Sequence, residues 1–257
     1  MTNYDYYNRE ERAICAHLFR LLHEQLGAKY KSPLGQFIET LSNGDLKFKN
    51  GKSSLKELQF ENIGIYCEAS LIRDAHENLK PDTFKFMDDL TRLIMKQEGV
   101  INDCRLYSQL PDPLNNNTKT HPKQIKQKAI KKGIELSDNE NKVYGSMQSM
   151  FNAKPDLVIT LDNILLVCEA KHTEEFDEKQ INRTWNIADV WATLLYKDLG
   201  FTEPPIYNVF KLGAANFKPD INWSRVAEIA DKTYSALDRS RTAINSGLEL
   251  LKRLKIE

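Results

Sequence analysis

The sequence predicts an α/β protein in which a central β-sheet is flanked by helices on both faces. Two observations carry this prediction. Two short apolar runs rich in β-branched residues, LVITL at 157–161 and ILLVCEA at 164–170, have the length of buried strands. Amphipathic helical patterns precede and follow these runs, and the composition, 41% hydrophobic and 28% charged, is that of a globular domain.

The N-terminal half is expected to be mainly helical. The pattern predicts helices over 8–27, 34–41, 60–79 and 82–98, and a strand over 100–107. In the first helix, Ile14, Leu18 and Leu22 recur at helical spacing, and Lys80-Pro81 separates the last two helices. We therefore expect residues 1–135 to form a mostly helical part for target binding or regulation.

From about residue 142 the pattern changes, and we expect residues 136–257 to form the core domain. KVYGSMQSM, DLVITL and ILLVCEA are predicted to form three successive strands. The elements expected after them are a helix over 176–199, a strand over 205–214, and helices over 220–232 and 236–254. This order is typical of a sheet with helices on both faces.

The amino-acid composition excludes some classes of function. Lysine plus arginine and aspartate plus glutamate both total 36, so the formal net charge is zero, which argues against a protein that coats nucleic acid with its whole surface. The four cysteines are scattered and form no CxxC, so a zinc site is not expected. We see no signal sequence, no membrane-spanning run and no nucleotide-motor motif, and we expect a soluble, cytoplasmic protein.

The most basic stretch of the chain runs from residue 119 to residue 132. It contains six lysines and no acidic residue: Lys119, Lys123, Lys126, Lys128, Lys131 and Lys132. Two interpretations stay open at this stage. The run is either a solvated, mobile segment, which is common for such runs, or a patch that faces the phosphates of a nucleic acid.

The two apolar runs are predicted to form a hairpin. Asp162-Asn163 is a favoured composition for a two-residue turn, so Leu161 should face Ile164. If the pairing continues, side chains alternate between the two faces of the hairpin, so every second residue lies on the same face. The side chains expected to share that face are Leu157, Ile159, Leu161, Ile164, Leu166 and Cys168. Since both faces are apolar, the hairpin should lie in the middle of the sheet.

The same pairing places two carboxylates opposite each other. Asp156 should face Glu169, and Lys171 should lie on the same side of the sheet, diagonal to Asp156. Two buried carboxylates repel, and a divalent cation removes that repulsion, with Mg²⁺ or Mn²⁺ suited to hard oxygen ligands. The ordinary alternative is that both acids lie at strand ends in solvent, paired with Lys154 or Lys171.

PD at 155–156 and EAK at 169–171, on the two sides of a hairpin, resemble the signature of the PD-(D/E)XK nuclease superfamily. The resemblance covers about residues 140–215 and implies the restriction-endonuclease-like fold with an αβββαβ core and Mg²⁺-dependent hydrolysis of phosphodiester bonds, usually in DNA. It further implies that Asp156, Glu169 and the carbonyl of Ala170 hold the metal ion, and that Lys171 positions the attacking water.

Two further residues are sought because many members of this superfamily carry them. A glutamate on the helix before the strands is matched by Glu11, with Glu68 as the rival. A glutamine on the helix after the third strand is matched by Gln180. Ordinary roles compete in each case: Glu11 suits the first turn of a helix, and Gln180 suits an exposed helix position. His172 should point away from Lys171 and take part in packing.

The leading interpretation is a Mg²⁺-dependent endonuclease acting on DNA, in a setting such as restriction or anti-phage defence, with a homodimer or a partner subunit as options. An exonuclease or an RNA-acting nuclease remains open. The rival from another class is a catalytically silent nucleic-acid-binding or scaffold protein with the same fold. A purely helical interaction protein conflicts with the two adjacent β-rich runs.

Overall fold

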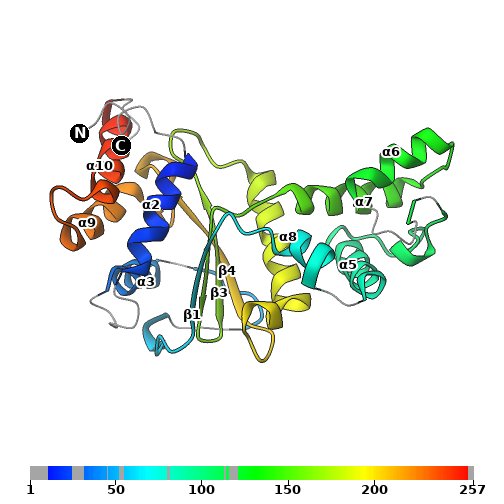
Figure 1. Cartoon of the computed structure of the whole chain (residues 1–257), viewed down its shortest axis with the longest axis horizontal. Coiled ribbons are helices and arrows are strands. Elements are labelled where there is room, and N and C mark those ends of the chain that lie inside the picture. Colours follow the sequence, from blue (N-terminus) through cyan, green and yellow to red (C-terminus); the bar gives the residue numbers. More distant parts are fainter. Residues whose placement is uncertain are drawn as a thin grey trace. The chain divides into compact units, whose positions relative to one another are not determined.

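The computed structural model describes residues 11–24, 32–44, 46–51, 55–79, 82–112, 114–115 and 121–253 (Figure 1). These residues form two compact units. Unit 1 takes its residues from Met1–Ala69, Pro155–Trp185 and Pro205–Glu257, and unit 2 takes its residues from Ser70–Lys154 and Asn186–Pro204. This division differs from the expected boundary after residue 135, because the sheet draws a strand and two helices from the N-terminal part.

Unit 1 is built on a five-stranded open sheet with the order β1-β2-β3-β4-β5. The strands are β1 (Ile63–Cys67), β2 (Leu157–Leu161), β3 (Ile164–Ala170), β4 (Ile206–Gly213) and β5 (Ile221–Asn222). β2 pairs antiparallel with both β1 and β3, whereas β4 runs parallel to β3 and to β5. The chain is therefore an α/β protein with a mixed sheet, as the sequence predicts at the level of fold class.

The hairpin forms in the predicted register. Leu161 pairs with Ile164 and Leu157 pairs with Cys168. Asp162 adopts a positive φ of 52°, a conformation that aspartate tolerates better than most residues. All residues of β2 and β3 are buried, which confirms that the hairpin lies in the middle of the sheet.

The two faces of the sheet are covered by different helices. On one face lie α2 (Glu11–His23), α3 (Pro33–Ser42), α9 (Trp223–Thr233) and α10 (Arg239–Arg253) (Figure 1). The six hairpin side chains that were expected to share a face all belong to the core beneath these helices. The other face receives the first turns of α8 (Glu178–Leu194), where Thr184 reaches Glu169.

Unit 2 contains helices only, among the residues that the structure describes. They are α4 (Leu71–Asp74), the π-helix η3 (Ala75–Leu79), α5 (Thr83–Gln97), η4 (Tyr107–Gln109), α6 (Lys123–Lys132), α7 (Asp138–Asn152), the last turns of α8, and η5 (Tyr196–Leu199). Arg105 and Glu140 form an ion pair with an Nη2–Oε2 distance of 2.8 Å. Gln97 on α5 donates to Asp189 in the second half of α8 at 2.9 Å.

The predicted helix over 60–79 is wrong at its start. Residues 63–67 form β1, in which Ile63, Ile65 and Cys67 alternate toward the core. Only the residues after Ser70 are helical. A short strand followed by a helix gives apolar residues at mixed spacings, and pairing of β1 with β2 decides the outcome.

Two strands predicted for the middle of the chain are wrong as well. KVYGSMQSM lies within α7, whose start is fixed by a capping box. Ser137 Oγ accepts from the N–H of Glu140, and the Glu140 carboxylate accepts from the N–H of Ser137. Residues 100–106 form no strand, and Tyr107 begins the 3₁₀ turn η4.

The remaining helices follow the predicted pattern closely. α3, α5, α9 and α10 form at the expected places, within a few residues at each end. α2 covers the middle of the expected helix over 8–27, and the outer residues of that range lie outside the described part. Among the described residues, no helix is both long and apolar enough to cross a membrane.

The hairpin turn is tied to the segment before β1 through one carboxylate. Asp162 accepts four backbone N–H bonds, from Gln59, Phe60, Glu61 and Asn62, at 2.7–3.4 Å. Burial acts to raise the pKa of Asp162, but the four donors outweigh it and hold the pKa below 3.8. The charged form is thus favoured in the folded state.

We predict that Asp162→Ala lowers the free energy of unfolding by about 1–3 kcal/mol at pH 7, because four donors lose their acceptor. Since the folded-state pKa lies below the unfolded value, the stabilisation is present above pH ~4 and is lost as the pH falls through the folded-state pKa. Urea unfolding at pH 7 and pH 3 measures both effects. Asn163→Ala, at the exposed turn neighbour, is the control, and equal stability of both variants would contradict the role of Asp162.

Candidate functional site

Asp156 stands directly before β2 and is joined to the end of β3 by its side chain. Its backbone N–H donates to the carbonyl of Cys168 at 3.2 Å, and the backbone N–H of Ala170 donates to its carboxylate at 2.8 Å. The regular ladder ends at Leu157 and Cys168. The Asp156 carboxylate is therefore held at the backbone of Ala170, the residue between Glu169 and Lys171.

Glu169 is the penultimate residue of β3 and is only 4% exposed. Its carboxylate is held from α8 by two side chains. The Gln180 amide donates to Oε1, and Thr184 Oγ1 donates to Oε2 at 3.1 Å. The structure thus places Gln180, which the sequence indicated, against Glu169. Thr184 is an addition, and its spacing of four residues from Gln180 on one helix face is the signal that could have found it.

Lys171 follows β3 and is held by its backbone from two sides. Its N–H donates to the carbonyl of Leu212 on β4, and its carbonyl accepts from Trp223 Nε1, both at 2.8 Å. Its ammonium lies 3.8 Å from Glu169 Oε1. The Lys171 ammonium therefore faces the same carboxylate oxygen to which the Gln180 amide donates.

His172 lies on the opposite side from Lys171, as predicted. It is 4% exposed, its Nε2 is 3.3 Å from the carbonyl of Gly247, and its ring packs edge-on against Trp223. A packing role for His172 is therefore confirmed.

Of the two further glutamates, Glu68 lies beside Asp156 in the structure. The Glu68 N–H donates to the Asp156 carbonyl at 3.3 Å, and the Glu68 carboxylate pairs with Arg12 at 3.1 Å. Burial raises the pKa of the neighbouring Cys67 thiol, and the negative charges of Glu68 and Asp156 raise it further. Glu11 begins α2, but its side chain lies outside the described part, so both glutamates remain predictions.

The oxygen atoms gathered at the ends of β2 and β3 suit a small hard cation. No group of three or more His, Cys, Asp or Glu that would enclose a metal ion occurs among the described residues. Mg²⁺ does not need such a cage, because it is commonly bound by one or two carboxylates and completes its shell with water and phosphate oxygens. Asp156 and Glu169, with the Ala170 carbonyl, therefore form a chemically suitable donor set.

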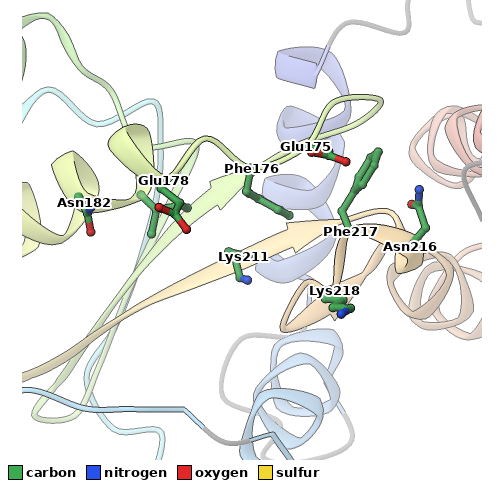
Figure 2. Close-up of a pocket in the computed structure, with 9 residues that line it drawn as sticks. Glu175, Phe176, Glu178, Asn182, Lys211, Asn216, Phe217 and Lys218 are labelled. Carbon is green, nitrogen blue, oxygen red and sulfur yellow. The ribbon is translucent and has the colours of Figure 1, made fainter.

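A cavity of about 620 Å³ lies in unit 1 between the start of α8, β4 and the 3₁₀ turn η6 (Ala215–Phe217) (Figure 2). Lys211 lines it and is the register partner of Glu169 on the neighbouring strand. Phe176, Phe217 and Lys218 line it as well. No pattern in the sequence drew attention to these four residues.

The lysine run is helical in its described part and lies in unit 2. It forms α6, with Ile125 and Ala129 buried and Gly133 as a left-handed C-cap. Lys131 and Lys132 are exposed, and Lys126 and Lys128 are half-buried. Lys119 and the side chain of Lys123 lie outside the described part. Residues 123–132 are therefore helical, and both a solvated helix and phosphate binding stay open as predictions.

Comparison with known proteins adds no assignment. No protein-family model, no curated protein and no solved structure matches the chain. The function is therefore argued from the geometry of the site.

We predict that Asp156→Asn and Asp156→Ala separate metal binding from folding. Asparagine keeps a carbonyl oxygen for the Ala170 N–H but loses the negative charge, so this variant should melt near wild type and bind Mn²⁺ weakly. Alanine also leaves the buried Ala170 N–H without its acceptor, which should cost a further ~1–3 kcal/mol of stability.

Calorimetric titration with Mn²⁺ and urea unfolding measure the two effects on the same preparations. Unchanged Mn²⁺ affinity in both variants would remove Asp156 from the set of metal ligands. Equal stability of both variants would show that the bond to Ala170 does not stabilise the fold.

Proposed function

We propose that this protein is a Mg²⁺- or Mn²⁺-dependent endonuclease of the PD-(D/E)XK type that hydrolyses phosphodiester bonds in DNA. The observation that carries the proposal is the hydrogen bond from the Ala170 N–H to the Asp156 carboxylate. It brings the aspartate of the PD half to the EAK half, where Glu169 and Lys171 face the same side of the sheet. Restriction or anti-phage defence, and a dimer or partner subunit, rest on the resemblance alone.

The order of elements in unit 1 supports the proposal. A helix (α2), three antiparallel strands (β1 to β3), a helix (α8) and a strand parallel to β3 (β4) follow one another, as in the αβββαβ core that the resemblance implies. The additions are α3, between α2 and β1, and the segment 70–154, between β1 and β2. The insertion thus falls between two core strands, not before all three.

Each residue of the site has a separate role in the proposed hydrolysis. Asp156 and Glu169 would hold the divalent cation, which supplies charge neutralisation and Lewis acidity when bound. Gln180 and Thr184 fix the Glu169 carboxylate in one orientation. In the reaction, a water oxygen bonds to phosphorus and releases a proton, while the bond to the leaving sugar oxygen breaks and that oxygen takes up a proton from solvent. The Lys171 ammonium positions the water or stabilises the charge that develops on the phosphate.

One observation favours the rival without cleavage. Both oxygens of Glu169 already accept hydrogen bonds from α8, and the side chain is almost fully buried. A nucleic-acid-binding or scaffold protein that retains only the fold would not need Glu169 to be accessible to a metal ion.

Incubation of supercoiled, linear and single-stranded DNA and of RNA with Mg²⁺, Mn²⁺ or EDTA distinguishes a nuclease from a silent protein. Metal-dependent cleavage of any substrate excludes the silent protein, and cleavage of RNA alone replaces the DNA assignment.

We predict that Lys171→Met strongly lowers the rate of cleavage but preserves the fold. The neighbours of Lys171 bind its backbone, which methionine retains, and the apolar stem of the side chain is kept. The melting temperature and Mn²⁺ affinity should stay near wild type. Loss of the ammonium should lower the rate of plasmid nicking by about 10²-fold or more.

Thermal melting, Mn²⁺ titration and nicking are to be measured on one preparation. Lys179→Met, an exposed lysine on the first turn of α8, is the matched control and should nick at the wild-type rate. Full nicking by Lys171→Met would remove the lysine from the mechanism. A collapsed melt would show that the lysine is structural.

We predict that α6 contacts phosphates. Changing Lys126, Lys128, Lys131 and Lys132 to glutamine should weaken DNA binding and reduce its salt dependence, by a slope of about 1 for each lysine that contacts a phosphate. The control changes four lysines on other elements to glutamine: Lys85, Lys96, Lys197 and Lys232. Fluorescence anisotropy between 50 and 200 mM salt gives the slopes. A slope equal to that of the control would leave α6 as a solvated helix.

A further inference from the structure

The cavity in unit 1 opens on the same face of the sheet as the candidate active site. Glu169 on β3 pairs with Lys211 on the parallel strand β4, and Ala170 pairs with Leu212. Side chains alternate along both strands, so Lys211 points to the face on which Glu169 and Lys171 lie. Lys211 lines the cavity (Figure 2), which therefore begins one strand away from the carboxylate.

Phe176 connects the cavity wall with Lys171. Its ring lies over Gly213, where a Cβ atom would come within 2.9 Å of Phe176 Cζ and 3.5 Å of the Lys171 carbonyl oxygen. The absence of a side chain at Gly213 therefore allows the ring to pack at the end of β4. The ammonium of Lys211 stands 5.5 Å from the centre of the same ring, so an aromatic surface and a cation meet beside the candidate catalytic lysine.

The lining combines the groups that bind a single nucleotide. Phe176 and Phe217 offer aromatic rings, and Lys211 and Lys218 offer positive charge (Figure 2). Glu178 and Asn182 from α8 add groups that can bond the edge of a base. The volume of about 620 Å³ lies within the range of ~300–1,000 Å³ for small-molecule pockets. Glu175 lines the cavity as well, so two carboxylates accompany the two lysines, and an uncharged apolar ligand would not account for these four charged groups.

We propose that this cavity receives one unpaired nucleotide of the substrate strand, next to the phosphate that is cleaved. The base stacks on Phe176 or Phe217, and its phosphate contacts Lys211 or Lys218. This inference rests on the proposed nuclease function and narrows its substrate class. A base within a duplex is covered by its neighbours on both faces, so it reaches an aromatic pocket only after leaving the stack. The substrate is therefore DNA that is single-stranded or opened at this position.

Binding of labelled DNA in EDTA tests the inference without cleavage. The probes are a single strand, a blunt duplex of the same sequence and a duplex with one unpaired nucleotide, with free deoxynucleoside monophosphate as competitor. We expect the single strand and the interrupted duplex to bind at least about tenfold more tightly than the blunt duplex. Competition by the free nucleotide at millimolar concentration or below supports the pocket, whereas equal affinity for all three DNA probes overturns the inference.

Two variants address the pocket directly. Phe217→Leu should raise the Kd for the single strand about tenfold, which is ~1.4 kcal/mol, while Phe217→Trp should retain affinity because it keeps an aromatic face. Lys218 is exposed, so Lys218→Gln should fold normally and lower the salt slope by about 1. Phe84→Leu, at a half-buried phenylalanine of unit 2, is the matched control.

The outcomes separate this inference from the proposed function. Wild-type affinity and salt slope in both Phe217→Leu and Lys218→Gln overturn the nucleotide pocket, even if the protein cleaves DNA. Loss of single-strand binding in these variants, with Phe84→Leu unchanged, supports the pocket even if no cleavage is found. Metal-dependent cleavage is scored in its own assay and decides the proposed function alone.

Discussion

The hydrogen bond from the Ala170 N–H to the Asp156 carboxylate is the contact on which the site depends. Asp156 stands outside the regular ladder, which ends one residue later, so nothing in strand pairing alone would fix its side chain. Ala170 is buried, and a buried N–H without an acceptor is costly. The same bond therefore gives the buried Ala170 N–H its acceptor and holds Asp156 at the end of β3, next to Glu169 and Lys171. Folding and site geometry share one interaction here.

Glu169 shows how a buried carboxylate is kept in place. Burying an ionised carboxylate is unfavourable unless hydrogen bonds and an opposite charge compensate for the lost water. Gln180 and Thr184 supply direct hydrogen bonds from α8, and the Lys171 ammonium lies farther away, 3.8 Å from Oε1. These partners hold one rotamer, which is the kind of support that a binding or catalytic carboxylate requires. The arrangement also explains why Thr184 is buried on an otherwise mixed helix.

The hairpin and its carboxylates could be predicted because their signals are local. The two-residue turn fixes the register, and the register fixes the face of every side chain between Leu157 and Cys168. β1 was missed because its five residues gain strand structure only by pairing with β2, a strand far along the chain. α7 was misassigned although S-x-x-E at Ser137 and Glu140 announces a capping box. The cavity could not be foreseen, since the start of α8, β4 and η6 meet only in the folded unit.

The long insertion, residues 70–154, lies at the end of the sheet that carries Asp156. The chain leaves unit 1 after Ala69 and returns at Pro155, and these two points flank paired strands. Cys67 pairs with Leu157, and the Glu68 N–H donates to the Asp156 carbonyl. The sheet holds the two ends of the insertion together, and the entropy cost of closing a loop grows only slowly with the length of the loop. An insertion at this point therefore costs the sheet little, and its two junctions stand next to Glu68 and Asp156.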